Sequence, residues 1–108
     1  MKTLVLRLDP RRLDNPDLDI RYRLPDLLAE RSDGVISGDG YDYAPGTDIL
    51  LLYLRASDLQ AALACVVDVV ENVRVLNNDL RQGVVVAVER PSGSEVVYPS
   101  GFKGPFLP

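Results

Sequence analysis

The chain contains no histidine and no tryptophan, and its 108 residues include only one cysteine and two lysines. Histidine is the side chain that exchanges protons most readily at neutral pH, so its absence removes every serine–histidine and cysteine–histidine catalytic arrangement. Structural and catalytic zinc sites draw on several cysteine and histidine ligands, which this sequence does not have. We therefore expect a protein that is not an enzyme and that uses neither a metal nor another cofactor.

The single cysteine and the lack of long apolar runs bear on where the protein acts. Cys65 alone can form no disulfide within the chain, which fits a reducing compartment, and its place at the border of an apolar helical stripe predicts a core residue. No stretch approaches the ~20 apolar residues of a membrane-spanning helix. Residues 1–3 lead directly into an alternating segment, unlike a signal peptide. We expect a cytoplasmic protein that binds no membrane.

Charge is spread unevenly along a chain whose net charge is −4. Residues 14–48 hold nine acidic residues against three arginines, a net charge of −6, whereas residues 1–13 carry +3. Binding of nucleic acid requires clustered lysine and arginine facing phosphates, so the acidic middle argues against it. An acidic surface attracts a basic protein partner, although solubility alone would also favour such a composition.

Apolar patterns predict the main elements. Residues 49–54 are apolar at every position, which predicts a strand covered on both faces, and the helix after Ser57 carries one apolar stripe. Ser57 and Gln60 have the spacing of a helix-capping box. Further strands are predicted over residues 2–8, 35–43, 84–88 and 95–98.

The segment between residues 14 and 34 is ambiguous. Apolar and charged residues alternate strictly up to Leu24, as in a strand, and Pro25 disfavours helix in the residue before it. We predict a turn over residues 15–17, an extended stretch to Leu24, and a helix from Pro25 to about Ser32, closed by a left-handed Gly34. The alternative is one longer helix kinked at Pro25.

The order strand, helix, strand, strand, helix, strand predicts an α+β fold. We expect a two-layer sandwich of the ferredoxin-like split βαβ kind with an added C-terminal β-hairpin. Residues 1–98 would form a single α+β domain, and residues 99–108 an irregular C-terminal tail packed on the domain through its apolar residues, Phe102, Phe106 and Leu107. The sheet face away from the helices is too apolar for water, so either this tail or a second chain should cover it.

The stretch from Ser37 to Asp48 carries the predicted binding surface, because two tyrosines lie there among carboxylates at the end of a strand. Tyrosine gives contact area at low entropic cost, and carboxylates steer and pair with basic groups. The spacing of the acids does not fit an EF-hand, and the glycines lack the lysine of a phosphate loop. In the competing interpretation both tyrosines pack inward. The predicted partner-binding residues are Asp39, Tyr41, Asp42, Tyr43 and Asp48, with Asp14, Asp17, Asp19 and Asp26 as a possible extension.

These observations favour a non-catalytic protein-binding module. Its most concrete form is an immunity or antitoxin-type inhibitor that docks the acidic, tyrosine-bearing surface on a basic toxin or enzyme. The alternative is a homodimeric regulatory or ligand-sensing ferredoxin-like domain, formed by pairing the open sheet faces. A third hypothesis, an enzyme that uses carboxylates alone, would require a deep pocket with two facing acids.

Overall fold

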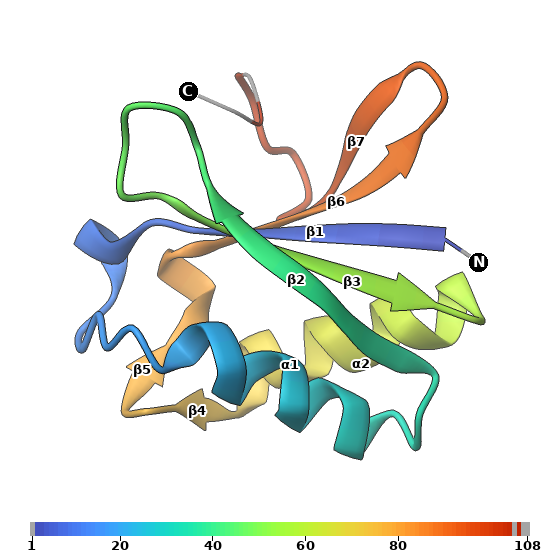
Figure 1. Cartoon of the computed structure of the whole chain (residues 1–108), viewed down its shortest axis with the longest axis horizontal. Coiled ribbons are helices and arrows are strands. Elements are labelled where there is room, and N and C mark those ends of the chain that lie inside the picture. The colour runs from blue at the N-terminus through green and yellow to red at the C-terminus, as the bar shows by residue number, and fades with distance from the viewer. Residues whose placement is uncertain (1, 105, 107–108) are drawn as a thin grey trace.

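Two helices cover one face of a five-stranded antiparallel sheet in the computed structural model, which describes residues 2–104 and 106 (Figure 1). The sheet strands are β1 (Lys2–Leu8), β2 (Ile36–Tyr43), β3 (Leu50–Ala56), β6 (Val84–Arg90) and β7 (Gly93–Tyr98). The helices are α1 (Ile20–Arg31) and α2 (Leu59–Asn72). Shorter elements are η1 (Pro10–Arg12), β4 (Arg74–Val75), β5 (Asn78–Asp79) and η2 (Leu80–Gln82). The predicted α+β sandwich is confirmed.

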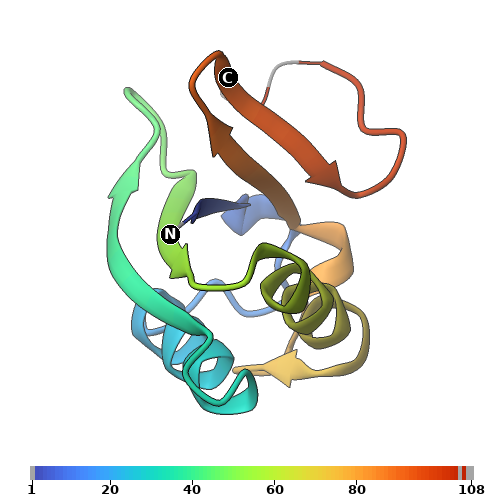
Figure 2. The same cartoon turned by 90° about the vertical axis from the view of Figure 1, so that its right-hand side faces the viewer.

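The order of the strands is β2-β3-β1-β6-β7. Because β3 is antiparallel to both β1 and β2, the two strands that α1 connects run parallel with β3 between them. By the same reasoning α2 connects β3 and β6 across β1. These directions are the ones that a split βαβ arrangement requires, and the ferredoxin-like assignment itself stays a prediction. The β6–β7 hairpin rises from the sheet on the side away from the helices (Figure 2).

Helix α1 begins at Ile20, so the extended stretch predicted up to Leu24 is wrong and the longer-helix alternative is right in placing Pro25 within the helix. The reason is the burial of Ile20, Leu24 and Leu28, whose spacing of four places them on one side of the helix. Each such side chain contributes about 1.5–3 kcal/mol when buried. Together they exceed the roughly 3 kcal/mol that a proline costs inside a helix.

The ends of the helices differ in detail from the predicted caps. Asp58, and not Ser57, caps α2, because its side-chain oxygen accepts a hydrogen bond from the Ala61 N–H at 3.1 Å. At the end of α1 the predicted left-handed residue is present, since Gly34 has a φ of 84° and its N–H donates to the Ala29 carbonyl at 3.0 Å. Asp33, with a φ of 54°, shares this conformation and completes the turn.

The two faces of the sheet are covered by different parts of the chain. Leucines of β1, β3 and the helices form the larger cluster on the helix side. On the other face, Val5 and Leu51 belong to a second buried cluster against which Phe106 of the C-terminal tail packs. The Arg7 guanidinium lies 5.2 Å from the Phe102 ring centroid, and Arg7 Nη1 donates a hydrogen bond to the Phe106 carbonyl. The tail therefore contacts this face; Leu107, also predicted to pack, lies outside the described residues.

Replacing Pro25 with alanine is expected to stabilise the protein. Alanine supplies the backbone N–H that proline lacks, so the Arg21 carbonyl can accept its helical hydrogen bond, and the cost of roughly 3 kcal/mol for proline inside a helix is removed. Alanine also increases the conformational entropy of the unfolded chain, which lowers the free energy of unfolding by up to about 1 kcal/mol. We expect Pro25→Ala to raise the free energy of unfolding in urea by about 2 kcal/mol. Pro45→Ala, in an exposed turn, is the control, and its free energy of unfolding should equal that of the wild type or be slightly lower. A loss of stability in Pro25→Ala would contradict this account of α1.

Candidate protein-binding surface

The structure brings only part of the predicted site together. Asp39, Tyr41, Asp42 and Asp48 are exposed on or after the edge strand β2, and Tyr43 is half-buried against the core. Each of these residues is therefore on the β2 side of the sheet. Which face of the strand each side chain occupies follows from the pairing with β3.

The pairing with β3 separates the aspartates of β2 from the tyrosines. Tyr41 pairs with Leu52, which belongs to the helix-side core, whereas Asp42 pairs with Leu51 of the tail-side cluster. Cross-strand partners share a face, so Tyr41 and Asp42 lie on opposite faces of β2. Asp39 lies where the register shifts between Gly38 and Tyr41 and forms an ion pair of 3.3 Å with Arg55. The carboxylates of Asp39 and Asp42 therefore do not flank Tyr41.

On the helix side, α1 completes a row of three aromatic rings that we call the tyrosine row: Tyr22, Tyr41 and Tyr43. The Tyr22 and Tyr41 rings meet edge to face at 6.1 Å between centroids, and Tyr41 and Tyr43 do so at 6.2 Å. The guanidinium of Arg21 lies over Tyr22 at 4.9 Å and over Tyr41 at 5.1 Å. Sequence reasoning missed Tyr22 and Arg21, which only the helical register of residues 20–31 could have placed here.

Neighbouring side chains of the row shift the pKa values of Arg21 and Tyr41. Hydrogen bonding to Tyr43 is the main cause that raises the pKa of Arg21, and bonding to Tyr22 is the main cause that raises the pKa of Tyr41. At neutral pH Tyr41 is therefore protonated and Arg21 is charged. Arg21 thus places one cation over two rings of the row.

The most exposed apolar side chains cluster around this row. Among the described residues the large apolar side chains that are exposed are Leu18, Tyr22 and Tyr41, at 62%, 53% and 41%. Leu18 lines a small hollow with Tyr43, and Tyr43 contacts Tyr41, so the patch is continuous. Scattered exposed apolar residues are ordinary, whereas a contiguous group marks an interaction site. We define the α1–β2 surface as these three residues together with the acids beside them, Asp17, Asp26 and Asp48.

A groove of about 310 Å³ runs between α1 and β2 within this surface. Its lining residues are Arg21, Tyr22, Pro25, Asp26, Gly38, Gly40 and Tyr41. Gly40 has a φ of 97°, a conformation that side-chain-bearing residues rarely adopt. The shift in pairing between Gly38 and Tyr41 thus depends on glycine, and Gly38 and Gly40 contribute only backbone to the lining of the groove.

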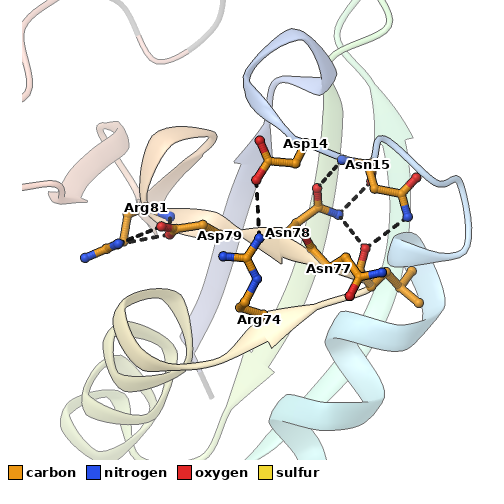
Figure 3. Close-up of polar contacts among 8 residues, drawn as sticks. Asp14, Asn15, Arg74, Asn77, Asn78, Asp79 and Arg81 are labelled. Atoms are coloured by element: carbon orange, nitrogen blue, oxygen red, sulfur yellow. Dashed lines mark hydrogen bonds and ion pairs between the residues drawn. The ribbon is translucent and has the colours of Figure 1, made fainter.

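The loop that carries Asp17 and Leu18 is fixed by a buried amide (Figure 3). The Asn78 side chain is fully buried; its Oδ1 accepts from the Asn15 N–H and its Nδ2 donates to the Asn15 carbonyl, both at 2.6 Å. Asn78 starts β5, and the β4–β5 turn before it has two residues with positive φ, Leu76 and Asn77. This hairpin, which the sequence analysis did not predict, therefore anchors the entry to α1.

Cys65 and the acidic side chains are the other groups that could take part in chemistry or bind a metal. Burial raises the pKa of the half-buried Cys65 thiol, which lowers the share of reactive thiolate at neutral pH. Within residues 2–104 and 106, no group of three or more acidic, cysteine or histidine side chains could hold a metal ion.

Neither α1 nor α2 is long and apolar enough to cross a membrane, and these are the α-helices of the described part of the chain.

No known protein-family model matches this chain, and no curated protein or solved structure matches it either. Support for a function of this chain therefore comes from the geometry of the α1–β2 surface.

Replacing Asn78 with alanine is expected to loosen the loop before α1. The change removes two hydrogen bonds between the buried Asn78 amide and the Asn15 backbone, and each such bond contributes about 0.5–1.5 kcal/mol net. We expect Asn78→Ala to lower the free energy of unfolding by about 1–3 kcal/mol, with faster amide hydrogen exchange at Asn15. Asn72→Ala is the matched control, because the Asn72 amide bonds Asp68 on the helix surface, and it should change stability by less than about 0.5 kcal/mol. Equal effects would contradict the anchoring role.

Stability should also depend on the ionisation of Asp79. The Asp79 carboxylate accepts from the Arg81 side chain at 2.6 Å and from the Arg81 N–H at 3.1 Å, and these bonds lower its pKa to about 2. A folded pKa below the unfolded value stabilises the fold above pH ~4, and this contribution is lost as the pH falls toward ~2. Carboxyl NMR titration should give a midpoint near 2. Arg81→Gln should move that midpoint toward the ordinary value, and Arg90→Gln should leave it unchanged.

Proposed function

We propose that the chain is a non-catalytic protein-binding module that docks the α1–β2 surface on a basic protein. One observation carries this proposal: the large exposed apolar side chains of the described residues lie on one surface with carboxylates beside them. Buried apolar and aromatic anchors dominate the energy of protein interfaces, and charged rims steer the partner.

The geometry of the tyrosines suits an interface anchor. Tyr22 and Tyr41 support each other edge to face, so little side-chain freedom remains to be lost on binding. Three carboxylates accompany the patch, and none of them, Asp17, Asp26 or Asp48, forms an ion pair within the described residues. A partner that presents arginine or lysine would find these carboxylates available.

The most concrete version of this function is an immunity or antitoxin-type inhibitor. A chain without histidine, and with a single thiol of raised pKa, is better suited to blocking an enzyme than to catalysis. Toxins that cut nucleic acids need basic clefts to hold phosphates, and an acidic aromatic surface is complementary to such a cleft. The lone cysteine supports a cytoplasmic location for this inhibitor.

The homodimeric alternative gains no support from a specific contact. It requires the sheet face away from the helices, where Phe106 already packs beside Val5 and Leu51 and where Tyr53 is half-buried. It stays a prediction, and Tyr53 provides a variant that separates it from the proposal.

The test has two stages. Co-purification from the native host, with the wild-type chain and the Tyr22→Ala/Tyr41→Ala variant as baits, identifies a partner whose capture depends on the tyrosines. The partner is then purified for calorimetry and for an assay of its own activity. We expect a basic partner that the chain inhibits, and each tyrosine substitution should weaken binding by about 30-fold, as truncation of a central anchor does.

Matched variants make this result specific. Tyr53→Ala removes a tyrosine from the opposite face and should change affinity by less than about twofold. Asp26→Asn/Asp48→Asn should slow association at low salt, whereas Glu30→Gln/Asp33→Asn, with the same change in charge, should not. Recovery of the chain without a partner, or binding that depends on Tyr53 and not on Tyr22 and Tyr41, would overturn the proposal.

A further inference from the structure

A second hollow, which shares no lining residue with the α1–β2 surface, lies where β1 ends and β6 begins. Its volume is about 350 Å³, within the range of small-molecule sites. Its ionisable lining residues are Arg7, Asp9, Arg12 and Arg81. The rest of the lining consists of Gln82, Gly83, Val84, Val85, Pro99 and Phe102. We call this hollow the arginine pocket.

The charge of the arginine pocket is opposite to that of the chain as a whole. Three guanidiniums face one carboxylate in the lining, a net charge of +2 in a protein of net charge −4. Arg11 pairs with Asp9 and Asp79 pairs with Arg81 just outside the lining, and these two added charges cancel. Even without Arg7, the arginines Arg11, Arg12 and Arg81 stand against two carboxylates, Asp9 and Asp79, so the pocket keeps a positive charge that attracts anions.

The guanidiniums come from three segments that the fold holds together. Arg7 is the penultimate residue of β1, and its guanidinium lies 5.2 Å from the Phe102 ring centroid and 5.7 Å from that of Phe106. Arg12 lies in η1, where Asp9 caps the turn, and Arg81 lies in η2, where Asp79 does the same. The Asp9 N–H donates to the Gly83 carbonyl at 3.0 Å and so ties the two turns together. The pocket is thus formed by ordered backbone.

The arginines are close enough to influence one another. Burial is the main cause that lowers the pKa of Arg7, and the nearby charge of Arg12 lowers it further, whereas Asp9 raises it. An anion between these guanidiniums would relieve that repulsion. Arginine offers planar sets of N–H donors that match the oxygens of phosphate and carboxylate groups.

We propose that the arginine pocket binds a small multivalent oxyanion, a phosphate or polycarboxylate group of a metabolite. The guanidiniums of Arg12 and Arg81 contact its oxygens, and the half-buried Arg7 supplies positive charge in the same lining. The Phe102 ring forms an apolar wall against which the uncharged part of such a ligand packs. This site is independent of the docking function proposed above.

The test is an NMR titration of the full ¹⁵N-labelled chain with pyrophosphate, with citrate and, as a control for ionic strength, with sodium chloride. We expect saturable shifts with at least one multivalent anion, confined to the amides of residues 81–85 and 100–102, and none of this pattern with chloride. If pyrophosphate binds with higher affinity than citrate, the ligand is assigned as a phosphate. If citrate binds with higher affinity, the ligand is assigned as a carboxylate. No saturable shift with either anion would overturn the proposal.

A pair of double variants separates a specific site from general charge attraction. Arg12→Gln/Arg81→Gln removes two pocket guanidiniums and should weaken anion binding at least about tenfold. Arg31→Gln/Arg90→Gln removes two arginines that also form surface ion pairs, with Asp68 and Glu95, and should weaken it less than about twofold. If Arg12→Gln/Arg81→Gln fails to fold, Arg12→Gln alone, at an exposed site, should still weaken binding severalfold. Equal losses in both double variants would overturn the proposal.

Discussion

The packing of one stripe of α1 against the sheet determines where the exposed aromatic side chains lie. Ile20, Leu24 and Leu28 are buried on the helix-side core, and this fixes the rotation of the helix about its axis. With that rotation Arg21 and Tyr22 face β2, where the Tyr41 ring meets Tyr22 edge to face and lies under the Arg21 guanidinium. The hydrophobic core thus sets the position of the exposed aromatic surface, although none of its residues belongs to that surface.

A second constraint acts on the loop before α1. The buried amide of Asn78 pairs with the backbone of Asn15, so a polar group inside the protein is satisfied by the segment that it positions. Leu18 follows three residues later, in the turn two residues before α1 begins. The exposed patch is therefore held by apolar packing on the side of Tyr22 and by hydrogen bonds on the side of Leu18.

How much the sequence predicts depends on whether one periodicity dominates a segment. Residues 2–8 and 84–88 have one apolar pattern each, and both form the predicted strands. Residues 18–28 fit both an alternating and a helical pattern, and only burial against the sheet decides between them. The β4–β5 hairpin was not predictable, because its turn has Leu76 at a φ of 50° in place of glycine. Tyr41, Tyr43 and Asp48 followed from their closeness in the chain, whereas Tyr22 required the tertiary structure.

The irregular pairing at Gly38–Tyr41 has a consequence for the behaviour of the protein in concentrated solution. Strand β2 lies at the edge of the sheet, where unpaired backbone groups can recruit the edge of another molecule and seed aggregates. The break in register, the left-handed Gly40 and the charged Asp39 and Asp42 interrupt the straight ladder that such recruitment needs. The chain can therefore keep an open, aromatic-rich border without polymerising through it.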